Sequence, residues 1–558
     1  MGSQCSDCKC PNPNEPAVVQ LGRALPSDYV AKVISDFAPS EGPVVEKVIS
    51  EVLALDGSID LEDPEELAVD LGSTDPANHS CHADGASVAS RLSTIPALTI
   101  EPELLRGVSM TQCLQHGSRL WLKAPSDWQL EERLALFCSS EPTTEIDVFI
   151  SHTWTERSSS KFCFLLASHG WPVSLLLWVL AVVLSMTCCI LRFLPMPLQR
   201  TFIFVSQLEE APAGFWVLAA GLVAQIIGLY VSPYVPSRAG WGTCFVDFMS
   251  INQADEELMQ KGIRGIGGFL QHSKVLLILW SPAYLSRLWC VFELAVFRMA
   301  NPNGKISLVP MVMVKLAVCC FLTMLCAVIS TMSVPCLKLD SPNASFRLQV
   351  ILITIGALPL AVAVHKSRKS ISEKQHLVEE LANFTLSECL CSKESDREFV
   401  IQSIKSLYGS ETEFEAYVQN NLREELMGWR FRWTTPKPLL LMICLPGIAG
   451  SLDVTAGLAR AGYPIKDLLT WFCASTVGFA TLWTYTWWQV LLRLTDRFFA
   501  TAQHRSVDIL KTLSIYLIFL VMVCSGVVAS RAAMERGNLM VGVWCLTALL
   551  AAVFSNCC

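Results

Sequence analysis

Eight long apolar runs constrain the fold of this chain more than any other feature of its sequence. Hydrophobic residues make up 52% of its 558 residues and charged residues only 16%, whereas roughly a quarter of the residues in a soluble domain are charged. A helix needs about 20 consecutive apolar residues to cross a bilayer core. The runs lie at residues 171–194, 214–235, 309–334, 348–364, 439–458, 468–491, 509–528 and 539–554. They predict an α-helical, multi-pass integral membrane protein whose first partner is the lipid bilayer.

The number of membrane spans depends on the weakest of these runs. The runs at 348–364 and 539–554 are short for a bilayer. The run at 439–458 contains Pro446 and Asp453, and a charged residue inside a span is costly. The sequence therefore predicts seven or eight spans.

The amino terminus carries a pattern for lipid attachment and no apolar signal segment. Gly2 follows the initiator Met, and Ser6 stands four residues later, as in N-myristoylation sites. Cys5 is placed for palmitoylation, and two acyl chains hold a protein on a membrane where one binds only weakly. Two alternatives remain open: a disordered end with incidental cysteines, or a metal site from Cys5, Cys8 and Cys10, which lacks a fourth ligand.

The distribution of basic residues predicts the orientation of the chain. Acylation of this kind occurs in the cytosol and places the N-terminus there. With eight spans, the loops on that side are 236–306, 365–438 and 492–508, and they hold more Lys and Arg than the opposite loops, as cytoplasmic loops do. Both termini are therefore predicted to be cytosolic. The 23 cysteines form no spaced framework and are predicted to be thiols.

The segments between the apolar runs divide the chain into domains. Residues 1–140 mix proline with an acidic stretch and predict a largely disordered arm. Apolar residues at helical spacing on both sides of a turn at 408–410 predict two amphipathic helices that pack on a cytosolic domain or on the membrane surface. The predicted domains are the arm at 1–140, an α/β domain in two halves at 141–170 and 236–314, an inserted transmembrane hairpin at 171–235, a transmembrane pair at 315–364, the helical segment at 365–438 and a C-terminal transmembrane bundle at 439–558.

The two halves of the α/β domain alternate strand and helix patterns. Apolar strands are predicted at residues 146–150, 244–248, 275–279 and 306–313. Short helices are predicted at residues 161–169, 263–271 and 289–294. Strands that are apolar throughout and alternate with helices predict a parallel sheet that is buried on both faces.

Three sequence blocks in this domain resemble Toll/interleukin receptor (TIR) domains. They are DVFISH at the first strand, FVDF at the second, and SKVLLILWSPAYLSRLWCVFEL across the third strand and the helix that follows. The last block is the most specific of the three. The resemblance implies a flavodoxin-like α/β fold, which here is interrupted by two membrane spans and lacks an evident last strand and helix.

The resemblance also implies a candidate catalytic site. Some TIR domains cleave the glycosidic bond of NAD with a glutamate that corresponds to Glu293. A carboxylate there stabilises an oxocarbenium-like transition state, and Trp289, one turn earlier on the same helical face, offers an indole for stacking. Ser151 and Asp247, at the first and second strands, are the further candidate substrate-binding residues. The alternative is that Trp289 belongs to the core and that the domain binds other TIR domains without hydrolysing anything.

The sequence thus favours a membrane protein that signals through its TIR-like module, by self-association or by binding other TIR-like domains. NAD is the candidate substrate, and an NAD nucleosidase is the candidate enzyme. A channel or transporter with a regulatory or scaffolding TIR-like module is the alternative from another class, and an inactive structural remnant is the third. No cofactor, metal site or nucleic-acid partner is predicted, and the nine histidines show no metal-ligand spacing.

Overall fold

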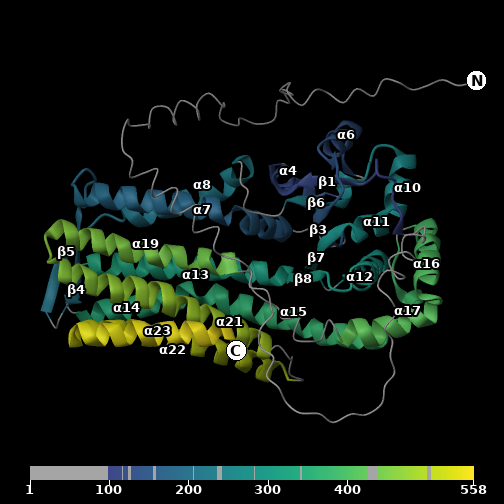
Figure 1. Ribbon diagram of the computed structural model, residues 1–558. Helices are drawn as coiled ribbons and strands as arrows, with labels where there is room; N and C mark the ends of the chain where they lie inside the picture. The colour runs from purple at the N-terminus through teal and green to yellow at the C-terminus, as the bar shows by residue number, and fades with distance from the viewer. Residues whose placement is uncertain are drawn as a thin grey trace, which may run out of the picture. The chain divides into compact units, whose positions relative to one another are not determined.

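The computed structural model describes the chain from Leu98 to Cys557, except for residues 116, 124–126, 155–158, 205–206, 236–241, 282, 338, 340–341, 392, 425–436 and 499–503. The chain divides into two units, Met1–Asp84 and Gly85–Cys558, and all described residues belong to the second. The predicted acylation residues Gly2 and Cys5 lie outside the described residues. The second unit combines a six-stranded sheet with a bundle of long helices (Figure 1).

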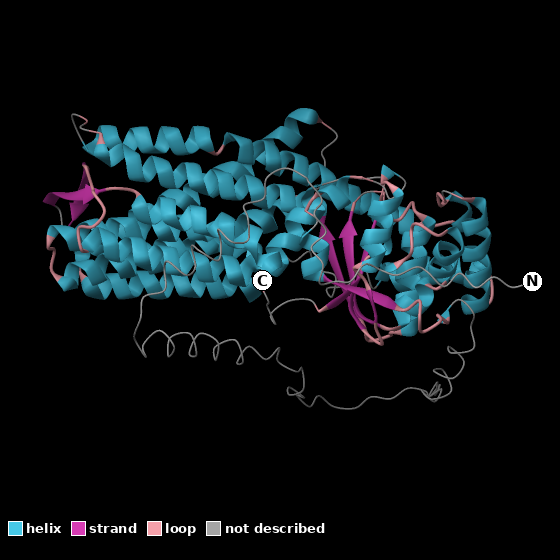
Figure 2. Cartoon of the chain, turned by 90° about the horizontal axis from the view of Figure 1, so that it is seen from above, coloured by secondary structure: helices cyan, strands magenta, loops and turns pink. Residues whose placement is uncertain are grey.

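The six strands form a mixed sheet in the order β2-β1-β6-β3-β7-β8 (Figures 1 and 2). Their bounds are β1 Arg106–Ser109, β2 Glu141–Pro142, β3 Ile146–His152, β6 Thr243–Phe245, β7 Ser273–Trp280 and β8 Lys305–Pro310. β3 pairs in parallel with β6 and β7, and β7 pairs in parallel with β8. The four strands predicted from the sequence are therefore present. They form a parallel set in the chain order second, first, third, fourth, which is an order of doubly wound α/β sheets.

The edge of the sheet formed by β2 and β1 corrects two predictions. These are the prediction of a purely parallel sheet and the prediction of disorder over residues 98–140. β1 runs antiparallel to β6, and β2 runs antiparallel to β1. Three helices follow β1, namely α4 Met110–Gln115, α5 Arg119–Leu122 and α6 Leu130–Cys138. From this segment Met110, Trp121 and Trp128 are buried in the core of the domain. Residues 98–140 therefore belong to the α/β domain, because they remove apolar surface on one face of the sheet from water.

Side chains alternate along the strands and so reach two separate apolar cores. Phe149, Phe245 and Ile278 pack on the face covered by α11 Ile266–Gln271 and α12 Leu288–Ala300. Val148 and Leu277 pack on the other face with α4, α5 and the start of α7. The remaining short helices of the domain are α9 Asp247–Ser250 and α10 Glu256–Arg264. The predicted burial of the central parallel strands on both faces is confirmed.

A further helical layer packs against α12 and consists of α16 Glu394–Tyr408, α17 Glu411–Tyr417 and the π-helical turn η7 Val418–Leu422. Val400 and Phe414 are buried in the same apolar cluster as the residues of α12. Gly409 has a φ of 89° between the helices, and the Ser410 side chain accepts a hydrogen bond from the Glu413 N–H at 3.1 Å. The predicted pair of amphipathic helices is confirmed, and its apolar face packs on the α/β domain.

Seven helices in the described part of the chain are long and apolar enough to cross a membrane. They are α7 Ser159–Ile190, α8 Trp216–Val231 with the turn η4 Ser232–Tyr234, α13 Met311–Ser333 with the turn η5 Val334–Cys336, the segment Arg347–Arg368 of α14 Pro342–Gly356 and α15 Leu358–Ala382, α19 Lys437–Ala461, α22 Arg505–Arg536 and α23 Asn538–Cys557. Large apolar side chains such as Leu180, Val183 and Leu517 are exposed on them. Such surfaces are typical of helices surrounded by lipid.

The remaining predicted span, at 468–491, lies on three consecutive helical elements without a break. These elements are α20 Ile465–Trp471, the π-helical segment η9 Phe472–Trp483 and α21 Thr484–Arg497. Two threonine hydroxyl groups bond to backbone carbonyls five residues earlier, which is the spacing of a π-helix. Thr481 donates to Thr476 O at 2.8 Å, and Thr484 donates to Phe479 O at 3.0 Å. π-Helical segments are rare and are often found at functional sites.

The boundary predicted near residue 170 is absent from the structure. The predicted helix at 161–169 and the predicted span at 171–194 form the single 32-residue helix α7, although Pro172 lies inside it. Phe164 and Leu165 near its start are buried in the α/β domain, whereas Val182 is buried in the bundle. A proline removes one hydrogen bond from a helix. Packing on both sides of Pro172 outweighs that loss.

The hairpin of β4 Leu198–Phe204 and β5 Gln207–Ala213 joins α7 to α8 at the end of the bundle away from the six-stranded sheet (Figure 2). At this end, Thr201 Oγ1 donates to Pro335 O at 3.1 Å just beyond α13. At the other end, Arg368 Nε of α15 donates to Phe498 O after α21 at 2.6 Å. Successive helices thus run between two ends, as successive membrane spans do.

Candidate functional site

The carboxyl ends of the parallel strands bring three predicted site residues to one edge of the sheet. Ser151 lies at the end of β3, and Asp247 follows β6. Glu293 reaches the same edge from α12 and contacts Ser151. Ligands of doubly wound sheets bind outside this edge. The structure therefore brings Ser151 and Glu293 into contact at this edge, and the charge of Asp247 acts on Glu293.

Ser151 links Glu293 to a tyrosine that the sequence analysis did not select. The Ser151 hydroxyl donates to Glu293 Oε2, and its oxygen lies 2.6 Å from the Tyr284 hydroxyl. Ser151 and Tyr284 are both 1% exposed, whereas Glu293 keeps part of its surface accessible. Because one hydroxyl proton is available per oxygen, the chain of donors runs from Tyr284 to Ser151 to the Glu293 carboxylate.

The environment of Glu293 moves its titration close to neutral pH. Burial raises the pKa of Glu293 to about 8; the hydrogen bond from Ser151 acts to lower it, and the charge of Asp247 acts to raise it further. A carboxyl group that titrates near neutral pH can exchange a proton with a substrate or with water. Glu293 therefore has the properties of a general acid or base.

Asp247 holds the indole of Trp154 at this edge, whereas the sequence suggested the indole of Trp289 for the site. Its Oδ2 accepts a hydrogen bond from Trp154 Nε1 at 2.8 Å, and its Oδ1 accepts one from the Phe248 N–H at 2.8 Å. Burial raises the pKa of Asp247, whereas these two hydrogen bonds act to lower it. The Trp154 ring meets His152 edge-on at a centroid distance of 4.8 Å. Asp247 thus fixes the orientation of an aromatic ring beside His152.

Trp289 is not part of this cluster of contacts. Its ring lies edge-on to Phe292 at 5.6 Å and is tilted against Phe399 of α16 at 6.3 Å. Trp289 and Glu293 share a helical face by spacing, but the layer of α16 and α17 provides the neighbours of the indole. The reason is the amphipathic pair itself, whose apolar face covers this part of α12. The structure therefore separates Trp289 from the contacts of Ser151 and Glu293.

Lys161 is a buried cation near the site that sequence reasoning missed. It is 1% exposed, and its Nζ donates to Thr153 O at 2.6 Å just after β3. Burial lowers the pKa of His152 well below its usual value, and the charge of Lys161 lowers it further. The only sequence signal was a lysine at the start of an apolar helix. Its burial depends on α7 starting directly behind the end of β3.

The sheet edge that carries the site also carries the starts of two candidate spans. β3 leads to α7 through residues 153–158, and β8 ends at Pro310, the residue directly before α13. Among the described residues, no group of three or more His, Cys, Asp or Glu side chains could hold a metal ion. The ionisable and hydroxyl side chains described at or near this edge are Glu293, Asp247, Ser151, Tyr284 and Lys161.

Comparison of the chain with protein-family models, with curated proteins and with solved structures found no match in any of the three. The functional interpretation of the site therefore rests on its own residues and their geometry.

Proposed function

We propose that this chain is a multi-pass membrane protein with a TIR-like cytosolic module that signals by association with itself or with other TIR-like domains and hydrolyses NAD at the sheet edge. The observation that carries the proposal is the contact of Ser151 with Glu293 at the carboxyl ends of the parallel strands. The order of those strands, which flavodoxin-like folds share, supports a TIR-like module. The apolar helices support the membrane location.

The proposed reaction breaks the bond between the ribose C1′ and the nicotinamide nitrogen. The bonding electron pair leaves with nicotinamide, which becomes neutral, and the ribose becomes oxocarbenium-like in the transition state. The ionised Glu293 carboxylate stabilises this positive charge and takes a proton from the attacking water, whose oxygen bonds to C1′. The products are nicotinamide and ADP-ribose. Tyr284 is the aromatic side chain that contacts Ser151 directly, whereas Trp154 contacts Asp247 and His152.

The test compares the full-length protein, purified in detergent, with two variants. Nicotinamide release from NAD is measured for the unmodified protein, for Glu293→Ala and for Glu257→Ala as a control, because Glu257 is 81% exposed in α10. We expect Glu293→Ala to lower the rate at least about 100-fold, the usual contribution of an acid–base group, and Glu257→Ala to leave it unchanged. Equal turnover by the unmodified protein and Glu293→Ala, or turnover in neither, would contradict the hydrolase.

A channel or transporter is the second candidate, and a cavity between the bundle helices favours it. The cavity has a volume of about 310 Å³ and includes Arg200, Arg531 and several hydroxyl side chains in its wall. Charged groups between candidate spans often mark a pathway. Flux of ions and small solutes from liposomes that contain the protein would support this function, and protein-free flux rates would exclude it.

A further inference from the structure

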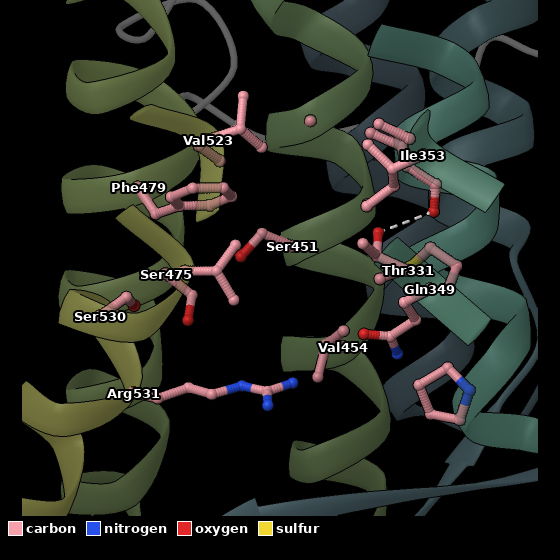
Figure 3. A pocket seen from close by; sticks show the side chains of 18 of the residues that line it. Thr331, Gln349, Ile353, Ser451, Val454, Ser475, Phe479, Val523, Ser530 and Arg531 are labelled. Carbon is pink, nitrogen blue, oxygen red and sulfur yellow. Dashed lines mark hydrogen bonds between the residues drawn. The ribbon is translucent and has the colours of Figure 1, made fainter. Parts of the chain in front are cut away.

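The bundle cavity lies between two groups of helices near the hairpin (Figure 3). α13 and α14 form one wall, η9 and α22 form the opposite wall, and α19 lies between them. Arg200 and Thr201 of β4 belong to the lining at the hairpin end. The volume of about 310 Å³ is within the range of small-molecule sites.

The buried arginine of the hairpin has a donor left over for a ligand. Arg200 is 4% exposed, and its Nη2 donates to Met332 O at 3.2 Å. Its Nε has no hydrogen-bond partner among the described residues. A buried donor without a partner is costly, and such a group in a cavity wall indicates a missing acceptor.

The acid whose charge acts on Arg200 has one bonded oxygen and one without a partner. Asp453 of α19 is 1% exposed and attracts Arg200 electrostatically. Asp453 Oδ2 accepts a hydrogen bond from the Val217 N–H at 3.0 Å, in the first turn of α8, where the helix dipole stabilises a carboxylate. Asp453 Oδ1 has no hydrogen-bond partner among the described residues. Asp453 itself does not belong to the cavity lining.

A second arginine reaches the same space from the opposite wall. Arg531 extends from α22 across the cavity toward Val454 of α19, and the Gln349 amide lies on the far side (Figure 3). Glu535, one turn further along α22, is the acid whose charge acts on Arg531. Two guanidinium groups and an amide therefore surround the end of the cavity that is near the hairpin.

The two arginines carry the charge of the lining, and both belong to its hairpin end. Hydroxyl side chains such as Ser475 and Ser530 and apolar ones such as Met332 and Leu337 also line that end. Farther from the hairpin the lining includes Met324, Phe479, Phe519, Val523 and Trp487, together with Thr323 and Thr484. A ligand that matches a charged end and a largely apolar remainder has an anionic group at one end and a hydrocarbon body at the other.

We propose that this cavity binds a single-chain anionic amphiphile, with its carboxylate or phosphate between Arg200 and Arg531 and its alkyl chain along Phe479 and Val523 toward Trp487. Arginine suits both head groups, because its planar donors match the oxygens of either. The hydrocarbon part of the ligand distinguishes it from a soluble anion. This site is independent of Glu293 and of the proposed hydrolase.

The test uses tryptophan quenching, because Trp471 and Trp487 line the cavity. The full-length protein in phosphatidylcholine nanodiscs is titrated with a dibromo fatty acid, with its uncharged methyl ester and with inorganic phosphate as a competitor. We expect the acid to quench saturably. We expect Arg200→Gln and Arg531→Gln each to weaken its binding about 10- to 100-fold, the value of a charged hydrogen bond. Arg200→Lys should weaken it less than Arg200→Gln, because lysine keeps the charge but lacks the planar donors.

Arg536→Gln is the matched control, because Arg536 is exposed on the same helix as Arg531 and is absent from the lining. We expect it to bind the acid as the unmodified protein does. Identical quenching by acid and ester, unchanged in Arg200→Gln, would overturn the anion site. Full competition by millimolar inorganic phosphate would also overturn the proposal, since the ligand would then be a small soluble anion. Size-exclusion profiles confirm that each variant remains folded.

Discussion

The sheet edge and the helical bundle both bury charged side chains, but they pair them differently. At the sheet edge, Glu293 accepts a hydrogen bond from Ser151, which itself contacts Tyr284. In the bundle, Arg368 is paired on several sides, whereas Arg200 keeps a donor without a partner among the described residues and lines a cavity. Full pairing stabilises a fold, and incomplete pairing beside a cavity indicates a ligand. The comparison therefore contrasts a bundle charge that has several partners with one that keeps a donor facing no partner among the described residues.

The largest effect is expected from breaking the fully paired charge of the bundle. Arg368 is 1% exposed, lies 2.9 Å from Asp508 Oδ1 and donates to Thr512 Oγ1 at 2.8 Å. Arg368→Ala leaves Asp508 without its cation, so we expect a loss of about 3–5 kcal/mol in the free energy of unfolding. Thermal unfolding in detergent measures it. The exposed Lys366, on the same helix, provides the control Lys366→Ala, which we expect to change stability by no more than about 0.5 kcal/mol. Similar losses of unfolding free energy in Arg368→Ala and Lys366→Ala would mean that the pairing of Arg368 does not stabilise the bundle.

The next effect concerns the carboxyl group at the sheet edge and depends on pH. Burial raises the pKa of Glu293 to about 8, whereas its usual value is 4.5. Between these values the folded protein keeps a proton that the unfolded chain has lost, so folding stability decreases as pH rises from about 4.5 to about 8. Glu293→Gln removes the titrating carboxyl group and therefore removes this decrease in folding stability. Relative to the unmodified protein, the variant should therefore gain stability with pH, by about 4 kcal/mol between pH 5 and pH 8.5.

Thermal midpoints of both proteins at pH 5 and pH 8.5 test this sign. Glu257→Gln, at an exposed position, should give the same difference from the unmodified protein at both pH values. If the difference in thermal midpoint between Glu293→Gln and the unmodified protein were also the same at pH 5 and pH 8.5, Glu293 would titrate normally. The sheet edge would then not perturb its carboxyl group.

The smallest effect is expected from Ser151→Ala, which removes one member of the network. It leaves the buried Tyr284 hydroxyl without its contact to Ser151 and should cost about 1–2 kcal/mol of stability. It also removes the hydrogen bond that lowers the pKa of Glu293, so the pH of half-maximal NAD hydrolysis should rise. Ser286→Ala, at an exposed position in the loop after β7, should leave the pH profile unchanged. A profile that shifts equally in both variants would contradict the assigned network.

Much of the α/β domain was predictable from local sequence patterns. Runs such as IDVFISH and SKVLLILW are apolar along their whole length, and only a strand covered on both faces places all of those side chains out of water. Because parallel strands end at a common edge, the same patterns place Ser151 and Asp247 at that edge of the sheet. The pair of amphipathic helices was predictable for a similar reason, since its spacing leaves one apolar face that must be covered.

The missed features depend on contacts between distant segments. β1 has only four residues, too few for a recognisable strand pattern, and it is stabilised by pairing with β6 more than 130 residues later, as in the pair Val108 and Cys244. The neighbours of Trp289 come from α16, and the burial of Lys161 comes from the close start of α7 behind β3. Helical spacing gives the face of a residue but does not give the element that packs against that face.

The sequence by itself determined the apolar helices and the parallel strands, because each is encoded by neighbouring residues with a fixed period. The candidate acid Glu293 came instead from the resemblance of three sequence blocks to TIR domains. Tertiary structure decided which charges are paired. Arg200 lies in a connecting hairpin and Arg531 near the end of a candidate span, and only the assembled bundle brings both to one cavity. The physical reason is that hydrogen bonding and burial depend on the distance between atoms in space, which the local pattern around either arginine does not specify.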